Sequence, residues 1–395
     1  MNRTAFVTLK STAPFAYLSV VPNLRRPGFL VSGLLLSLLI ASCAQTAGTA
    51  DTASAAGSVE ISTEGDTSIA AGTDGTTMQS AQPTPMGEHI RFEYTEISGL
   101  GYEEGVTRRD PSDIIRVGDT YYVWYTLIHA TTNGEPTPIY PEGYYGTVWY
   151  ATSTDGVHWV EQGEALGTGA PGAFDSHAVF TPTILVYEGL YYLYYTGVKP
   201  TPGRDDLAFE NNNTTDITAI GVAVSDSPDG PFVRPGTDPV IAISQVAEEF
   251  DSYRVDDARI LIRDGQIRLY YKGRSLSHGP TGPRHTEMGV AFATSPTGPF
   301  TKHPRPIMSG SHEVSIWQIG TQVAALASIS QSIYISDDGL QFTRYRENLR
   351  DRPWAPGLYR PHLTDHNARS IPGWGLSHGR QQGHVYLRRF EFVHE

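Results

Sequence analysis

Two carboxylates stand side by side at the start of a predicted strand in the middle of the chain. Asp256 and Asp257 directly precede a run of apolar residues that is typical of a buried strand. The segment 173–197 has nearly the same layout, but it carries Phe180 and Thr181 at the same two places. The repeated layout therefore does not require the acids. Because acidic side chains that meet in a pocket can transfer protons, these two are candidates for chemistry.

The layout recurs from His89 onward as a strand, a glycine turn, an aromatic strand and a third strand. Equivalent residues, such as Trp149, Gly221 and Gly289, follow one another at intervals of about 70 residues, a period that favours β-propeller blades. Five such units predict an all-β, five-bladed propeller that the strand at 89–97 closes, with two stacked β-sandwiches as the alternative. The aligned strand starts are 108–112, 179–183, 255–259, 311–315 and 360–364.

Aligned strand starts meet at one mouth of a propeller's central channel. The polar residues that depart from the repeat at this mouth are Asp110, Asp257, His312 and Glu313. Glycoside hydrolysis needs such groups, because one must protonate the leaving oxygen, another must take a proton from water, and a third can tune their pKa values. Structural roles stay open: Asp110 could cap a turn, Asp256 could be a solvated or ion-paired neighbour, and His312 could pack in the interior.

The composition argues against one class of partner. The formal net charge is -13 and no run is rich in Lys or Arg, whereas nucleic-acid binding requires clustered positive charge. A neutral or polyhydroxylated ligand, such as an oligosaccharide, is the better match. The 22 Tyr and 40 Gly residues support an all-β chain with many tight turns.

The N-terminal segment is similar to a bacterial lipoprotein signal. Two arginines precede an apolar run, 29–40, which ends shortly before Cys43, the one cysteine of the chain. We predict a signal peptide at 1–42, a flexible tether rich in Ser, Thr, Ala and Gly at 43–86, and the propeller at 87–395. Acylated Cys43 would anchor the protein to a lipid membrane, as an outer-membrane lipoprotein on the periplasmic or cell-surface side. A buried cysteine or an uncleaved membrane anchor is the alternative.

Several sequence blocks in one order resemble glycoside hydrolase family 117, the α-1,3-(3,6-anhydro)-L-galactosidases. The resemblance covers residue 89 to about 345 and rests on RRDPSDIIRVGDTYYVWYT, VWYATSTDGVHW, FDSHAVFTPTILVYEGLYYLYYTG, SPDGPF, LYYKG and SHEVSIW. It implies a five-bladed propeller that releases terminal 3,6-anhydro-L-galactose from neoagaro-oligosaccharides with inversion. Asp110 then matches the general base, and Asp257 matches the acid that orients and tunes the site. Glu313 matches the third acidic residue, and His312 matches an unusual general acid.

Sugar contacts are expected around these four residues, where the segments 199–216 and 274–288 should rim the pocket. The expected substrate-binding residues are Asp256, Thr181, His177, Arg284, His285, Glu287 and Trp317. At 256–258 the chain reads Asp-Asp-Ala where the family usually has His-Asp-Pro, which places an extra negative charge beside Asp257. Several family members dimerise through an N-terminal helical extension that has no counterpart here, so the oligomeric state stays open.

A group of histidines near the C-terminus suggests a metal site: His362, His366, His378, His384 and His394. Their spacings match no compact ligand set. We therefore predict no cofactor and name no metal ligand. A structural divalent cation near the hub, where His362 aligns with the strand starts, is the alternative.

Two other functions stay open, because acids at the hub do not encode the sugar. The first is a related propeller glycosidase that acts on arabinofuranosyl, xylosyl or another galactan-derived sugar. The second is a lipid-anchored glycan-binding protein without activity, which the altered residue at 256 keeps under consideration.

Overall fold

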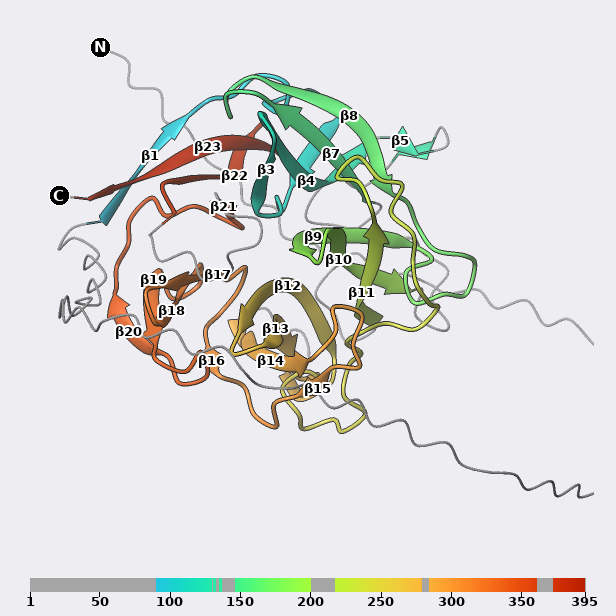
Figure 1. Ribbon diagram of the computed structural model, residues 1–395, viewed down its shortest axis with the longest axis vertical. Coiled ribbons are helices and arrows are strands. Elements are labelled where there is room, and N and C mark those ends of the chain that lie inside the picture. Colours follow the sequence, from blue (N-terminus) through green and yellow to red (C-terminus); the bar gives the residue numbers. More distant parts are fainter. Residues whose placement is uncertain are drawn as a thin grey trace, which may run out of the picture. The chain divides into compact units, whose positions relative to one another are not determined.

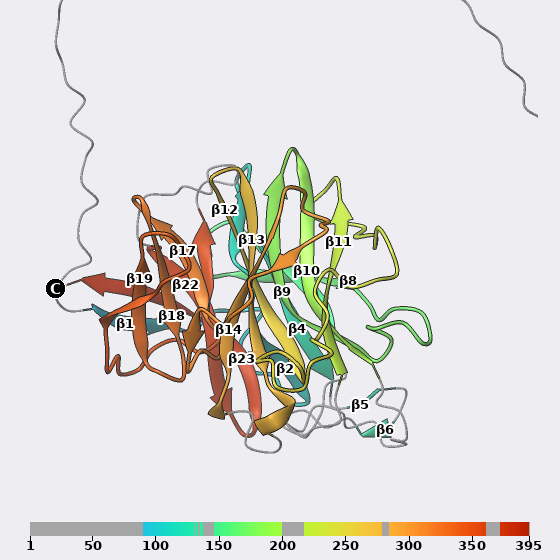
Figure 2. The same cartoon turned by 90° about the horizontal axis from the view of Figure 1, so that it is seen from below.

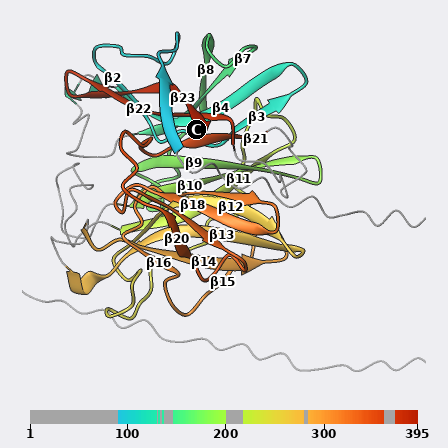
Figure 3. The same cartoon turned by 90° about the vertical axis from the view of Figure 1, so that its left-hand side faces the viewer.

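The computed structural model describes residues 90–129, 131–132, 135–136, 146–199, 217–278, 284–360 and 372–394. These residues form strands, turns and irregular segments with no α-helix, which confirms the prediction of an all-β fold. Figure 1 shows the sheets arranged around a common centre. In Figures 2 and 3 the long strands run along the axis down which Figure 1 is viewed, so their ends gather at two opposite faces.

The predicted signal peptide, Cys43 and the tether lie outside the described residues. Within the described ranges, no helix is long and apolar enough to cross a membrane.

The largest sheet has nine strands in the order β1-β23-β22-β21-β3-β4-β7-β8, with β2 also paired to β4. Their bounds are β1 (Ile90–Thr95), β2 (Val106–Arg109), β3 (Ile114–Val117), β4 (Thr120–His129), β7 (Thr147–Ser153), β8 (Trp159–Leu166), β21 (Gly357–Arg360), β22 (Trp374–Gln381) and β23 (His384–His394). A short parallel pair, β21 with β3, joins the C-terminal strands to the N-terminal ones. β5 (Thr131–Thr132) and β6 (Glu135–Pro136) form a separate two-stranded sheet.

Three further sheets follow the chain in order. The first has the order β11-β10-β9, the second β12-β13-β14-β15 with β16 on β14, and the third β17-β18-β19-β20. Their bounds are β9 (Ala178–Tyr187), β10 (Leu190–Lys199), β11 (Ile217–Ser225), β12 (Arg254–Arg263), β13 (Gln266–Arg274), β14 (Glu287–Ala293), β15 (Thr301–Lys302), β16 (Met308–Ser309), β17 (Ser315–Ile319), β18 (Gln322–Ala327), β19 (Ser332–Ser336) and β20 (Thr343–Arg346).

The two ends of the described chain pair with each other. β1 lies antiparallel to β23, from Ile90 opposite His394 to Thr95 opposite Arg389. The predicted closing role of the first strand is thereby confirmed. The pairing covers the edge of β23, which would otherwise expose a row of unpaired backbone groups.

Five large hydrophobic clusters explain why the second strand of each hairpin is apolar or aromatic at consecutive positions. They pack β4 against β10, β10 against β13, β13 against β18, β18 against β23, and β23 back against β4. Successive residues of β10 serve different clusters: Leu193 packs with Trp124, and Tyr194 packs with Leu269. A strand that is buried on both faces has no solvent side, so its sequence loses the alternation of polar and apolar residues.

A left-handed residue stands at the entrance of each of five hairpins. Its φ is 52° at Asp110, 47° at Thr181, 53° at Asp257, 52° at Glu313 and 44° at Ala355. The register of the first strand against the second shifts near this residue in β9–β10 and β12–β13. Such bulges change the direction of one side chain and are frequent beside active sites. The sheet around them supports the strained backbone.

Ala355 corrects the predicted alignment of the fifth strand start. The segment 360–364 was expected there, but the left-handed residue lies at 355, and β21 begins two residues later, at Gly357. Proline follows the left-handed residue here, as it does after Asp110 and Thr181. His362, which the incorrect alignment placed at the hub, lies outside the described residues.

A buried aspartate that binds a tyrosine hydroxyl and a cation recurs in two consecutive sheets, and we call this arrangement an ionic lock. The carboxylate of Asp175 accepts a hydrogen bond from the Tyr195 hydroxyl at 2.8 Å and pairs with Arg234 at 2.7 Å. At the equivalent place, Asp251 accepts from Tyr271 at 2.9 Å and pairs with Lys302 at 2.6 Å. The repeated Phe-Asp-Ser motif therefore has a structural role.

Gly221 is required beside the first lock, because a Cβ there would lie 2.6 Å from Cζ of both Phe174 and Tyr195. We predict that Gly221→Ala destabilises the protein by roughly 1–3 kcal/mol, since two packed rings would have to move. Gly236→Ala is the matched control, because a Cβ at that position meets open space. Thermal unfolding of both variants tests the prediction, and equal melting temperatures would contradict it.

Candidate active site

The three predicted catalytic carboxylates occupy the same structural position in three hairpins. Asp110 lies between β2 and β3, Asp257 lies in β12, and Glu313 lies two residues before β17. The charge of Asp110 acts on the pKa values of both other acids, so the structure brings the three into one electrostatic site. Thr181 and Ala355 occupy the two remaining positions.

Asp110 contacts one nitrogen of each of two side chains, Arg109 and His378. Its carboxylate lies 2.6 Å from Nε of Arg109 and 3.1 Å from Nε2 of His378, and its backbone N–H donates to Nε2 of His378 at 2.9 Å. Burial acts to raise the pKa of Asp110, but Arg109 and His378 outweigh it and hold the pKa well below its usual range. Asp110 is therefore charged at any physiological pH.

His378 is a site residue that the sequence patterns missed. It was considered only as one of several C-terminal histidines. The structure buries it in β22, where its backbone N–H donates to the carbonyl of Trp354 at 3.2 Å. Its place in the repeat could have identified it. Lys272 and Ser328 occupy the equivalent place in two other hairpins, where each lies opposite the residue that precedes a left-handed acid.

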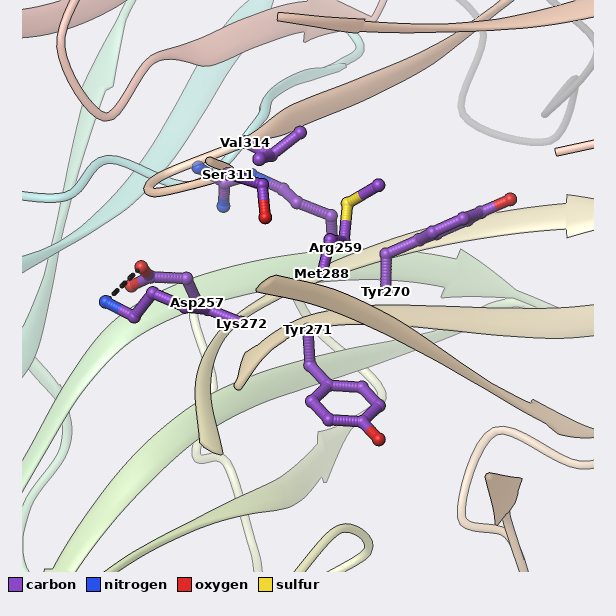
Figure 4. Close-up of a pocket in the computed structure, with 8 residues that line it drawn as sticks. All are labelled: Asp257, Arg259, Tyr270, Tyr271, Lys272, Met288, Ser311 and Val314. Atoms are coloured by element: carbon purple, nitrogen blue, oxygen red, sulfur yellow. Dashed lines mark ion pairs between the residues drawn. The ribbon is translucent and has the colours of Figure 1, made fainter. Parts of the chain in front are cut away.

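Asp257 is paired with Lys272, whose Nζ lies 2.7 Å from Oδ2 of Asp257 and 3.0 Å from Oδ1 of Asp256. Burial raises the pKa of Asp257; Lys272 opposes this, and the charges of Asp256 and Asp110 add to it. Figure 4 shows the pair at the edge of a cavity between β12, β13 and the segment before β17. That cavity offers about 10 Å³ to the centre of a water molecule, enough for about one water and not for a sugar.

Asp256 was expected to contact sugar, and the structure contradicts this expectation. The side chain is fully buried, and its carboxylate pairs with Arg254 as well as Lys272. Burial acts to raise its pKa, but these two cations lower it below the usual range. The extra negative charge is thus neutralised inside the protein, where it helps to hold the ammonium group beside Asp257.

Glu313 and His312 have opposite proton affinities. Burial raises the pKa of Glu313; His378 and Lys272 oppose this, while Asp110 and Asp257 add to it. Burial, Lys272 and Arg274 lower the pKa of His312 well below 6.5. These surroundings therefore favour the protonated form of Glu313 and the neutral form of His312.

The other expected sugar contacts divide into two groups. Trp317 is only 2% exposed and packs with Phe392 at 6.2 Å between ring centroids, so its predicted contact with substrate is wrong. Thr181 is also buried, and its hydroxyl lies 2.6 Å from that of Thr196. The more accessible candidates are His177, Glu287, Arg284 and His285.

Glu287 lies at the strand end that carries the predicted catalytic acids. It pairs with Gly273 across β13, and Gly273 pairs with Val255, two residues before Asp257. The ring of the exposed His285 stacks on His278 at 4.6 Å between centroids. This edge of β12–β14 is consistent with a rim of the site. Within the described ranges, no group of three or more His, Cys, Asp or Glu residues could hold a metal ion.

Comparisons with known proteins agree with this arrangement. Residues 105–279 match the model of glycosyl hydrolases family 43. Among solved structures, a family 117 glycoside hydrolase from the marine bacterium Zobellia galactanivorans is 29% identical, with a TM-score of 0.64 over 77% of this chain and 90% of that one. This chain is a glycoside hydrolase. The predicted resemblance to family 117 is confirmed, while a search of curated proteins found no match.

More distant solved structures share the fold of this hydrolase. Sucrose-6-phosphate hydrolase from Lactobacillus gasseri is 11% identical, with a TM-score of 0.54 over 75% of this chain and 62% of that one. A thermostable family 43 glycoside hydrolase is 14% identical, with a TM-score of 0.51 over 75% and 92%. The all-β architecture is therefore common to several groups of glycosidases.

The raised pKa of Glu313 predicts that its charge costs stability at neutral pH. The native state keeps a proton on Glu313 above the ordinary carboxyl pKa, so native stability falls as the pH rises through that window. Glu313→Gln removes this loss, and we expect its melting temperature to exceed that of the wild type by a margin that grows from pH 4 to pH 8.

Asp110→Asn is the control of opposite sign. The native pKa of Asp110 is lowered, so its charge stabilises the protein above the ordinary carboxyl pKa, and that stability is lost only in strong acid. We expect Asp110→Asn to lower the melting temperature at pH 7. A Glu313→Gln variant less stable than the wild type at pH 8 would contradict the assignment.

Proposed function

We propose that the hydrolase is a five-bladed propeller enzyme that releases terminal 3,6-anhydro-L-galactose from neoagaro-oligosaccharides, with inversion of the anomeric carbon. The main support is the set of three acids at equivalent left-handed positions, with the pKa of Asp110 lowered and that of Glu313 raised. The similarity to the family 117 enzyme supports the choice of sugar. Each of the five hairpins would begin one blade.

The opposite pKa shifts assign the two proton transfers. Asp110, charged at neutral pH, takes a proton from the attacking water, and Arg109 and His378 hold its carboxylate in place. We assign Glu313, whose pKa is raised by its environment, as the acid that gives a proton to the glycosidic oxygen. This transfers to Glu313 the acid role that the family resemblance implied for His312. For inversion, the two carboxyl groups must lie roughly 6.5–9.5 Å apart, so that a water molecule fits between the base and the sugar.

Asp257 completes the site as an orienting residue. Its left-handed backbone directs the side chain towards the other acids, and Lys272 fixes one of its oxygens. The negative charge of Asp257 also raises the pKa of Glu313, which favours the acid form.

A matched pair of variants tests the two assignments. Asp110→Asn should lower turnover by roughly 10²–10⁴-fold on every substrate, because water activation is needed whatever the leaving group. Glu313→Gln should cause a similar loss on neoagaro-oligosaccharides but a much smaller one on an aryl glycoside, since a good leaving group needs no proton. Circular dichroism confirms folding. If His312→Gln, and not Glu313→Gln, shows this dependence on the leaving group, the acid assignment is overturned.

The substrate is tested with a panel of neoagaro-, carrageenan-derived and arabinan oligosaccharides. We expect release of anhydrogalactose from the first set, with the inverted anomer appearing first by NMR. The match to the family 43 model supports a second candidate, hydrolysis of arabinofuranosyl or xylosyl residues. Release of arabinose or xylose alone would favour that candidate.

We also propose that the enzyme is a lipoprotein anchored to the outer membrane through acylated Cys43, on its periplasmic or cell-surface side. The signal-like N-terminal segment supports this. Cys43→Ala should move the protein out of the detergent phase in a partition experiment, because the acyl chains supply the membrane affinity. Unchanged partitioning would remove the proposal.

A further inference from the structure

Trp354 is a large aromatic side chain that stays exposed at the hub. It occupies, in the fifth hairpin, the position directly before the left-handed residue, which Arg109, Phe180, Asp256 and His312 occupy in the others. The first three of these side chains are buried, whereas Trp354 is 38% exposed. An exposed indole at this position leaves apolar surface that a ligand can cover with a gain in free energy.

Trp354 lies between the hairpins that carry the proposed base and the proposed acid. Its carbonyl accepts a hydrogen bond from the backbone N–H of His378, whose ring contacts Asp110. On the other side, Arg352 lies over the indole ring, with Cζ 4.6 Å from the ring centroid. Arg352 donates through Nε to the carbonyl of Ser328 at 2.6 Å.

Ser328 connects this arrangement to the acid. Its backbone N–H donates to the carbonyl of His312 at 3.2 Å, directly before Glu313. Arg352 is also within electrostatic range of Glu313, whose charge acts on the pKa of the guanidinium against the effect of burial. The backbone of Trp354 is thus tied to His378, and its ring to Arg352, which Ser328 connects to the residue before Glu313.

We propose that Trp354 is a substrate-binding residue on which a pyranose ring stacks beside the scissile bond. Arg352 covers one face of the indole and sets its orientation, which leaves the other face to the sugar. The C–H face of a pyranose is apolar and matches a flat aromatic surface, as in other ligand pockets that combine aromatic walls with a few polar groups. This inference rests on the proposed glycosidase function and identifies a contact that sets affinity.

The test is a binding titration in the Glu313→Gln background, which we expect to be stable and slow. Neoagarotetraose, or the panel oligosaccharide that the wild type cleaves, is titrated by calorimetry. Trp354→Ala should weaken binding at least tenfold, in the range expected for truncation of a central aromatic contact. Trp354→Phe should stay within about threefold, because a phenyl ring can still stack.

Tryptophan fluorescence gives a second readout. Ligand-dependent change in emission should disappear in Trp354→Phe although affinity is kept. The matched control is Trp374→Phe, in β22 four residues before His378. The Trp374 ring also lies under an arginine, Arg389, but it packs against Tyr121 and Tyr359. The control should keep both affinity and the emission change.

The outcomes separate this inference from the function on which it rests. If the wild type cleaves an oligosaccharide and Trp354→Ala binds it as tightly as the parent, the inference is wrong and the function stands. If the wild type binds without cleaving, the function fails, and the same titration still decides the role of Trp354. Absence of both cleavage and binding across the panel would overturn both.

Discussion

The left-handed residue at the entrance of each hairpin is the constraint on which the site depends. A residue other than glycine avoids this conformation unless the structure around it supplies compensating contacts. Here the support is continuous, because every hairpin packs against both neighbours and the last cluster packs β23 against β4. The closing pairs β1–β23 and β21–β3 keep that circle intact. With the backbone held in this way, an acid at that position meets the acids of other hairpins.

Electrostatic compensation is the second requirement. Three carboxylates in a largely buried site would repel one another, and basic side chains beside them offset this repulsion. Arg109 and His378 hold Asp110, whereas Lys272 serves both Asp256 and Asp257. Glu313 has no ion pair of this kind among the residues that the structure describes, and burial raises its pKa. The different surroundings of Asp110 and Glu313 thus shift their pKa values in opposite directions.

Much of the fold could be predicted from the sequence because blades are local. A strand, a turn and the next strand lie within about 30 residues, and their aromatic residues and glycines repeat visibly. Asp110, Asp257 and Glu313 could be recognised as candidates because the acidic residues are not required by the repeat, which carries other residues at the aligned positions of other units. The fifth hairpin was misaligned because its left-handed residue is Ala355, which carries no polar signal, and because 360–364 imitates the pattern. The sugar contact predicted for Trp317 was wrong because the sequence does not show whether a tryptophan near acidic residues is buried or exposed.

The amino-acid sequence alone therefore determined the all-β class, the repeat and the closing strand, and it predicted three candidate site carboxylates, since all of these follow from local patterns and their spacing. The tertiary structure alone decided which groups surround each acid. His378 reaches Asp110 although 268 residues separate them, and Arg352, which lies over Trp354 in the misaligned fifth hairpin, interacts electrostatically with Glu313. The protonation of a carboxyl depends on burial and on charges within a few ångströms, and such distances between remote segments are set only when the sheets close around their common centre.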